Sequence, residues 1–451
     1  MVITALLAVG GSGDVAAGAP ACSPTHRLEL QRALSAARRP ARIKRLRAEL
    51  ASCRPESRPL PGRTGAPFPL AFYPQSGDLW RDLLITNFVD LDPGGSTLDW
   101  SCGRQTYDGH GGQDSALRSF REQRLGVPVF AALDGRVLEV VDQYRDENTA
   151  ATSTPYDNHI VLDHGNDQLT IYGHLRRGST RVQPGDWVPA GTQLGLTGSS
   201  GNSTWPHLHF GALFEGRPYE PFAGSCRPGS SGWTGQVGLP PRPYLREVAL
   251  SAKPFAGRAA LPWDESVRTG TFVAGPRTVH VRFEAEWLPD EAAATLVVER
   301  PDGSVALAQT APLAVHSRRG AVDVRSLRLA LTPGRWRLRY QVGGETLAVA
   351  PFDVVASTRA VVNRPPNPVA VSVEPAGGVL LCRIHTSLAT EDPDYAIVSY
   401  RYRWLVGGRV VRAIRSAGLT DVLPRGRAPA GATCAVTPTD GRLDGPTSAA
   451  E

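Results

Sequence analysis

Short apolar runs separated by glycine and aspartate fill the chain from about residue 78 to residue 225. Four of these runs stand at residues 127–131, 136–141, 159–162 and 168–172. Runs of this length, bounded by turn-forming residues, are typical of short antiparallel strands joined by tight turns. We therefore expect an antiparallel β-sheet domain over residues 78–226.

Strict alternation of apolar and polar residues marks two later stretches. In residues 279–287 the odd positions are apolar and the even positions polar, and in residues 335–342 the even positions are apolar and the odd positions polar. Such strands bury one face and expose the other, as in a β-sandwich. We expect one β-sandwich over residues 245–356.

A further alternating run at residues 398–404 predicts a second sandwich over residues 369–446. Cys382, Trp404 and Cys434 resemble the core of immunoglobulin-like (Ig-like) domains in outline. Ala432 stands where such domains carry a tyrosine, so the resemblance is limited to that outline.

The N-terminal part differs in pattern. Leucine and isoleucine recur at steps of three and four residues over residues 22–57, which predicts an α-helical hairpin divided near Pro40. Residues 1–21 are apolar and small and resemble a signal peptide, although they lack a basic start. Stretches rich in proline, glycine and arginine predict linkers, at residues 58–77, 227–244 and 357–368. The predicted fold class is therefore mainly β, with an N-terminal helical hairpin and two C-terminal sandwiches.

The six cysteines form no Cys-x-x-Cys motif, and an even, dispersed set favours disulfides and an exported location. Six cysteines can pair into disulfides in many ways, and the sequence alone does not select one. We favour the pairs that each bracket one structural unit: Cys22–Cys53, Cys102–Cys226 and Cys382–Cys434. We expect the protein to be secreted or to lie in the periplasm or cell envelope.

The net charge of +6 is mild and spread along the 451 residues. It suits a polyanionic surface such as a cell wall, and a solvated basic surface fits equally well. Nucleic acid would require a denser basic patch and is not expected as a partner. No run reaches the about 18–20 apolar residues of a membrane-spanning helix, so we expect no integral membrane segment. The oligomeric state is left open.

Six of the ten histidines lie between residues 110 and 209. His110 and Asp114 form a His-x-x-x-Asp pair, and His207 and His209 form a His-x-His pair whose side chains share one face of a strand. Glycines between His110 and Asp114 disfavour a helix and permit a tight loop. Imidazoles and one carboxylate are the donors of a catalytic zinc site, in which three protein ligands leave one position open.

Each motif is weak on its own. His174 alone could be an ordinary half-buried histidine. His159 and His164 have no partner motif and are interpreted as structural or exposed, and His280 falls on the polar face of a sandwich strand.

Taken together, residues 107–222 resemble the lysostaphin/LytM-type zinc metallopeptidases of peptidase family M23. The similar blocks follow the order of that family, at residues 110–114, 127–137, 158–165, 172–175, 182–188, 190–195, 197–202 and 206–210. Ordered matches of this kind are far more specific than one motif. The chain departs from the family in extra residues at 117–126 and in a long loop at 143–157, which affect the shape of the groove.

The resemblance implies that His110, Asp114 and His209 bind one zinc ion per chain. It also implies that His174 and His207 act on the water and on the developing oxyanion, without assigning which is the base. The expected function is that of a secreted zinc endopeptidase that cuts peptide cross-links in bacterial peptidoglycan.

Two other functions remain open. The chain could be a catalytically silent protein that binds the wall or activates a partner hydrolase, but all five site positions are filled, which favours activity. It could also be an adhesion protein, although residues 245–446 show no cluster of catalytic residue types. A pro-segment role for residues 22–75 rests on their position alone.

Overall fold

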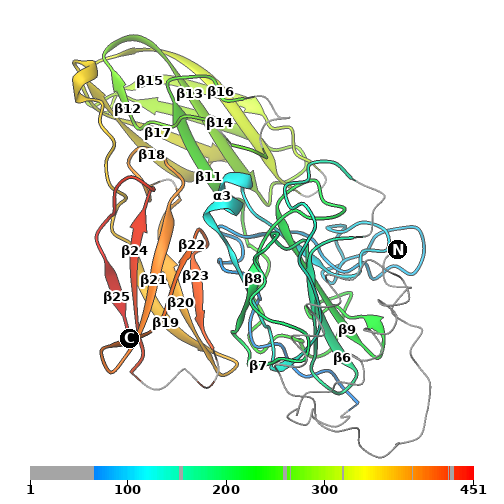
Figure 1. Cartoon of the computed structure of the whole chain (residues 1–451). Coiled ribbons are helices and arrows are strands. Elements are labelled where there is room, and N and C mark those ends of the chain that lie inside the picture. The colour runs from blue at the N-terminus through cyan, green and yellow to red at the C-terminus, as the bar shows by residue number, and fades with distance from the viewer. Residues whose placement is uncertain are drawn as a thin grey trace, which may run out of the picture.

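The computed structural model describes residues 65–151, 156–256, 262–264, 266–316, 319–388, 390–424, 426 and 431–451. Three β units meet around the short helix α3 (Phe120–Leu125) (Figure 1). The prediction of a mainly β chain with antiparallel sheets is confirmed for these residues. The expected signal peptide, helical hairpin and Cys22–Cys53 bond lie outside them.

The first unit is built on an eight-stranded antiparallel sheet with the order β1-β2-β9-β6-β5-β4-β7 and with β10 paired to β9. Its strands are β1 (Leu84–Asn87), β2 (Gln113–Ala116), β4 (Gly135–Val141), β5 (His159–Asp163), β6 (Gln168–Gly173), β7 (Trp187–Val188), β9 (His207–Phe214) and β10 (Arg217–Pro218). A small second sheet pairs β3 (Pro128–Phe130) with β8 (Gln193–Leu196). The alternation along β9 buries Leu208 and Phe210 and turns His207 and His209 to the opposite face.

The second unit packs two sheets face to face. One has the order β11-β13-β16 and the other β12-β18-β17-β14-β15. Their bounds are β11 (Tyr244–Ser251), β12 (Thr271–Val273), β13 (Gly275–Glu286), β14 (Ala293–Glu299), β15 (Val305–Pro312), β16 (Ala321–Leu331), β17 (Gly334–Val342) and β18 (Glu345–Val355). Phe283 stacks on Tyr340 between the sheets, at 4.1 Å between ring centroids.

Two details of this unit differ from a sandwich of purely antiparallel sheets whose outer faces are exposed to solvent. Strand β12 pairs with β18 in parallel. His280, expected on the polar face, is buried, because β11 and β16 flank β13 on both sides and Ser326 lies 2.8 Å from its Nδ1. It is a satisfied structural histidine.

The third unit also consists of two sheets, β19-β20-β23 and β22-β21-β24-β25. Its strands are β19 (Ala370–Ala376), β20 (Val379–His385), β21 (Ser399–Val406), β22 (Arg409–Ser416), β23 (Thr420–Leu423), β24 (Thr433–Thr439) and β25 (Ser448–Ala450), preceded by the 3-10 helix η3 (Thr358–Ala360). The Cys382–Cys434 disulfide joins the two sheets beside the buried Trp404. The immunoglobulin-like character of this sandwich stays a prediction.

The described parts of two expected linkers are packed into the first unit. Leu70 and Trp233 are buried in its core, and the backbone N–H of Leu70 donates to the carbonyl of Gly232 at 2.7 Å. The Cys102–Cys226 disulfide lies next to this region. Residues 65–77 and 227–244, predicted as linkers, therefore contribute to the core of the first unit, because proline and glycine break regular strands without preventing aromatic side chains from packing. The domain boundaries stay a prediction.

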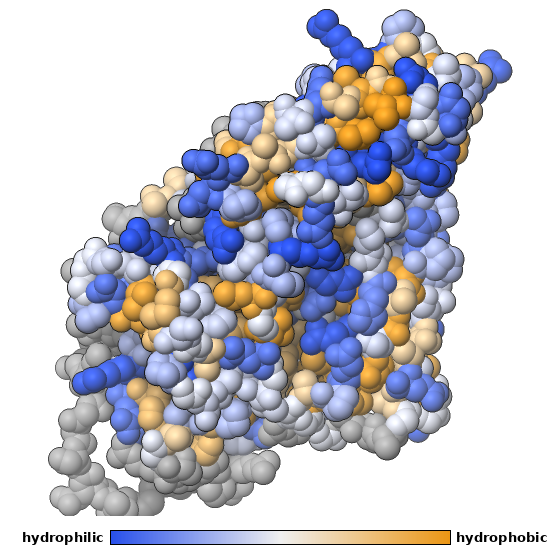
Figure 2. All heavy atoms as spheres, turned by 180° about the vertical axis from the view of Figure 1, so that it is seen from behind, coloured by the Kyte–Doolittle hydropathy of each residue, from blue (hydrophilic) through white to orange (hydrophobic). Residues whose placement is uncertain are grey.

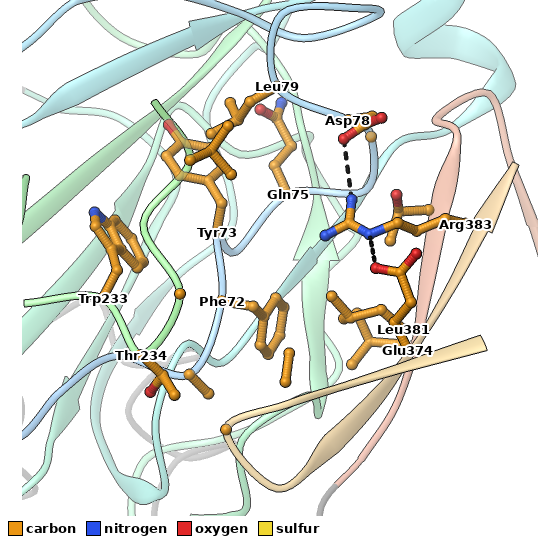
Figure 3. A pocket seen from close by; sticks show the side chains of 18 of the residues that line it. Phe72, Tyr73, Gln75, Asp78, Leu79, Trp233, Thr234, Glu374, Leu381 and Arg383 are labelled. Atoms are coloured by element: carbon orange, nitrogen blue, oxygen red, sulfur yellow. Dashed lines mark hydrogen bonds and ion pairs between the residues drawn. The ribbon is translucent and has the colours of Figure 1, made fainter. Parts of the chain in front are cut away.

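The third unit is held against the first by a shared apolar cluster. Phe72 and Phe130 contact Val379, Leu381 and Val422 across the boundary. Beside this cluster lies a cavity of about 300 Å³, at whose edge the Arg383 guanidinium joins Asp78 and Glu374, at 3.0 and 2.9 Å (Figure 3). The two units therefore share both apolar and charged contacts.

The rear surface of the molecule is mixed in character. Figure 2 shows hydrophilic residues between several smaller apolar patches. Among the described residues, no helix is long and apolar enough to cross a membrane.

A buried carboxyl group at the same boundary predicts a pH effect on stability. Asp82 accepts the backbone N–H groups of Asp78 and Leu419, at 2.6 and 2.8 Å. Burial is the main cause that raises the pKa of Asp82 to about 7. Because the folded-state pKa lies above the unfolded one, the contribution of Asp82 to stability is full below the unfolded pKa and declines as pH rises towards 7.

We expect Asp82→Asn to lose less thermal stability than the wild type when the pH is raised from about 4 to about 7. Asp302→Asn, at a fully exposed turn, is the control. Melting curves recorded across this range test the prediction, and parallel pH profiles for Asp82→Asn and the wild type would contradict it.

Candidate metal centre

Three potential metal ligands converge at the junction of β2 and β9. Asp114 on β2 stands directly opposite His209 on β9 in the strand register, and His110 approaches from the loop before β2. Asp114 Oδ1 lies 2.9 Å from His209 Nδ1 and 3.2 Å from His110 Nε2, and the two histidine nitrogens are 3.3 Å apart. All three donor atoms lie within 4.8 Å of one another.

This spacing fits a tetrahedral zinc ion. Bonds of about 2.0–2.1 Å at tetrahedral angles place neighbouring donor atoms about 3.3 Å apart. The Nδ1–H of His110 donates to the carbonyl of Phe88 at 2.7 Å, which leaves Nε2 with a free lone pair facing the other two donors. Two imidazole nitrogens and one carboxylate oxygen are a donor set that zinc accepts.

The electrostatics keep Asp114 ready to act as a ligand. Burial favours its neutral form, but the charges of His110 and His207 and the hydrogen bonds from His110 and His209 outweigh burial and hold its pKa well below the usual range. The group is therefore an anion at neutral pH. An anionic ligand lowers the charge that a divalent cation would bring into this buried position.

Two further histidines flank the cluster. His174 follows the end of β6 and His207 begins β9, with their ring centroids 4.5 Å apart. The Nδ1–H of His174 donates to the carbonyl of Ser200, and that of His207 to the carbonyl of Trp205, both at 2.7 Å. Each ring thus keeps Nε2 free, and His207 Nε2 lies 3.7 Å from Asp114 Oδ1.

Both flanking imidazoles are held neutral. Burial, followed by the charge of His207, lowers the pKa of His174 to about 4. Burial also lowers the pKa of His207. Neutral imidazoles with free Nε2 atoms beside a metal position can accept a proton from water.

The structure brings the five predicted site residues together, from segments almost one hundred residues apart. The remaining histidines of the first unit play other parts. His164 is buried between the carbonyl of Asp134 and the hydroxyl of Thr170, both at 2.8 Å, which agrees with a structural interpretation. His159 forms ion pairs beside the site with Asp157 and Glu139.

Two neighbours of the site were missed by the sequence analysis. The side-chain amide of Asn87 donates to Asp114 Oδ2 at 2.8 Å, and Asp157 accepts the backbone N–H of His174 at 2.9 Å. Neither residue belongs to a motif of its own. The position of Asp157 directly before the matching block at 158–165 was the one available signal.

We expect Asn87→Ala to weaken zinc binding by about 10- to 100-fold, because Asp114 loses the donor that orients its second oxygen. Competition with a zinc chelator of known affinity measures the effect. Asn148→Ala is the control, since that side-chain amide donates to the carbonyl of Gly201. Equal zinc affinities for the two variants would contradict the orienting role of Asn87.

The donor cluster and the two flanking histidines lie at the sheet whose strands also carry a family match. Residues 115–221 match the model of Peptidase family M23. The resemblance seen in the sequence is therefore confirmed for this segment. The match begins one residue after Asp114, so the assignment of His110 and Asp114 rests on the geometry above.

Curated relatives match the same part of the chain. The Vibrio cholerae protein "Peptidoglycan DD-endopeptidase ShyA" is 34% identical over 110 residues, which cover 24% of this chain and 21% of the relative. The Neisseria meningitidis protein "DD-carboxypeptidase/endopeptidase Mpg" is 33% identical over 96 residues, covering 21% and 19%. The matches span about a fifth of these relatives.

Among solved structures, the catalytic domain of the antimicrobial peptidase lysostaphin from Staphylococcus simulans is 24% identical. The match covers 30% of this chain and 85% of that domain, with a TM-score of 0.20. A score this low supports no argument about the whole chain.

Proposed function

We propose that the protein is a secreted, zinc-dependent endopeptidase that hydrolyses peptide bonds in the cross-links of bacterial peptidoglycan. The observation that carries the proposal is the set of three donor atoms 2.9–3.3 Å apart, beside two neutral histidines whose Nε2 atoms are free. The names of the relatives ShyA and Mpg support peptidoglycan as the substrate class. The described disulfides support an exported location.

In this proposal His110 Nε2, Asp114 Oδ1 and His209 Nδ1 hold the ion. Zinc in such a site polarises a carbonyl and makes a bound water more acidic. The free Nε2 of His174 or His207 accepts the proton of the attacking water, and the resulting imidazolium stabilises the oxyanion and then protonates the leaving amine. Attack of the water oxygen on the carbonyl carbon forms the new carbon–oxygen bond and the oxyanion. The carbon–nitrogen bond then breaks as the carbonyl re-forms and the protonated amine leaves.

The backbone contacts of the two histidines matter for this chemistry. Carbonyl acceptors at Ser200 and Trp205 fix Nδ1–H and so fix which nitrogen takes the proton. The half-buried position of both rings, with side-chain exposures of 16% and 14%, limits competing water. The site is thus prepared for proton transfer before substrate arrives.

The test is the appearance of new amino groups in purified cell walls treated with the zinc-loaded full chain. We expect release by the wild type and by His385→Ala, which alters an exposed histidine of the third unit. His207→Ala should release amino groups roughly 100- to 10,000-fold more slowly. Zinc-loaded wild type that binds walls and releases no amino groups would contradict hydrolysis and support a silent, wall-binding protein.

A further inference from the structure

Asp157 lies next to His174 and contacts it through one carboxylate oxygen. Its Oδ2 accepts the backbone N–H of His174 at 2.9 Å and stands 3.7 Å from the Nδ1 of the same residue. Its other oxygen, Oδ1, is 3.1 Å from His159 Nδ1. One carboxylate thus touches both the backbone and the ring region of a flanking histidine.

The backbone of His174 requires such support. Its φ is +58°, a left-handed conformation that is unfavourable for a residue with a Cβ. A hydrogen bond from the N–H of His174 to a fixed acceptor stabilises this conformation. The ring of His174 can then reach the Ser200 carbonyl with Nδ1 while Nε2 faces the open side.

The backbone at Gly173 and Gly201 packs closely around the Asp157 side chain. A Cβ added at Gly173 would lie 2.9 Å from Asp157 Oδ2, and one added at Gly201 would lie 2.6 Å from Asp157 Cβ. A side chain at either position would therefore crowd Asp157, and at Gly201, where φ is +69°, it would also strain the backbone. The carboxylate has a defined place between two segments that also carry His174 and Ser200.

A second histidine, His159, contacts the other carboxylate oxygen of Asp157. His159 contacts Asp157 Oδ1 through Nδ1 and lies 3.7 Å from Glu139 Oε2 through Nε2. Burial opposes ionisation of Asp157, but the hydrogen bond from His159 and the charge of His174 lower its pKa to about 2. Hydrogen bonds to Asp157 and Glu139 overcome burial and raise the pKa of His159 to about 10. Around neutral pH, both carboxylates and the imidazolium between them are charged.

We propose that Asp157 is a positioning residue for His174, held in place by His159 and Glu139. The inference rests on the proposed function in one respect, the part that His174 plays in hydrolysis. The carboxylate fixes the strained backbone of His174, and its negative charge near Nδ1 stabilises the imidazolium that forms when Nε2 accepts a proton. In this proposal Asp157 acts through His174, the residue whose backbone and ring it contacts.

The kinetic test compares Asp157→Asn with Asp142→Asn in the zinc-loaded full chain. Asparagine keeps an acceptor for the His174 N–H and removes the charge. Asp142 is a matched control, because its carboxylate also holds backbone N–H groups, those of Gly178 and Thr180 at 2.6 and 3.1 Å. We expect Asp157→Asn to lower kcat by about 10- to 100-fold with KM and zinc content within about twofold of the wild type, and Asp142→Asn to change none of these.

His159→Gln provides a second variant if Asp157→Asn does not fold. It removes the cation that holds Asp157 and should lower kcat by a smaller factor, again without loss of zinc. Unchanged kcat in Asp157→Asn, or in His159→Gln where the first variant does not fold, would overturn the proposal. A fall in zinc content that matches the fall in kcat would also overturn it.

A readout that does not depend on hydrolysis separates this inference from the proposed function. In protein labelled with ¹⁵N-histidine, the ring signals of His174, assigned by their absence in His174→Ala, should shift in Asp157→Asn and stay in place in Asp142→Asn. If the wild type cuts no wall but these shifts occur, the proposed function fails and the positioning role stands. If the His174 signals are the same in Asp157→Asn and the wild type, the positioning role fails whatever the activity.

Discussion

Replacing His207 by alanine should leave zinc in place and slow hydrolysis strongly, whereas His209→Ala should lose both zinc and hydrolysis. The two residues are two positions apart on β9 and face the same side of the sheet. They differ in what they contact: His209 Nδ1 is 2.9 Å from Asp114 Oδ1, while the Nδ1–H of His207 donates to the Trp205 carbonyl. The expected loss of kcat for His207→Ala is roughly 100- to 10,000-fold, the usual contribution of a general acid or base.

The measurement pairs metal analysis with the rate of amino-group release for both variants. His164→Gln is a suitable control, since that residue is a buried histidine of the same unit outside the cluster. Loss of zinc from His207→Ala to the same degree as from His209→Ala would reverse the assigned roles. Retention of full activity by His207→Ala would leave His174 to serve both proton transfers.

The second large effect is expected from Arg246→Ala, which should destabilise the fold by about 3–5 kcal/mol. Arg246 on β11 is 2% exposed, donates to the Ala116 carbonyl at 2.8 Å and forms an ion pair with Glu284. Removing the guanidinium leaves the Glu284 carboxylate without its partner and the Ala116 carbonyl without this donor. Ala116 pairs with His207 in the strand register, so the change also reaches the site.

Arg242→Ala is the matched control for this prediction. Arg242 also forms an ion pair with a glutamate, Glu345, but its side chain is 69% exposed. Exposed pairs of this kind contribute about 0–1 kcal/mol. Thermal unfolding of both variants measures the difference, and equal melting temperatures would show that the contact between the first and second units carries little of the stability.

Much of this site could be predicted because its residues are local in sequence or fixed by strand geometry. The alternation in β9 was enough to place His207 and His209 on one face, and the ordered blocks indicated which distant segments accompany them. Asn87 and Asp157 could not be found in this way. Their contacts with Asp114 and His174 depend on how loops fold over the sheet, which no local periodicity encodes.

The limits of the fold prediction have a similar cause. Alternation predicts that a strand has a covered face, but it does not say what covers it, as His280 shows. Composition marked residues 65–77 and 227–244 as irregular, which they largely are, yet Leu70 and Trp233 complete the core of the first unit. The contacts of Phe120 in α3 with Trp263, and of Arg118 just before α3 with Glu391, likewise depend on partners more than one hundred residues away.

The central claim is that His110, Asp114 and His209 form a zinc site on which hydrolysis depends. Metal analysis of the purified full chain, followed by chelation and stepwise return of zinc during cell-wall digestion, tests it most directly. We predict about one zinc per chain, loss of amino-group release on chelation, and full recovery at one equivalent of zinc. A chain that binds no zinc, or that digests walls equally well after complete removal of metal, would contradict the account.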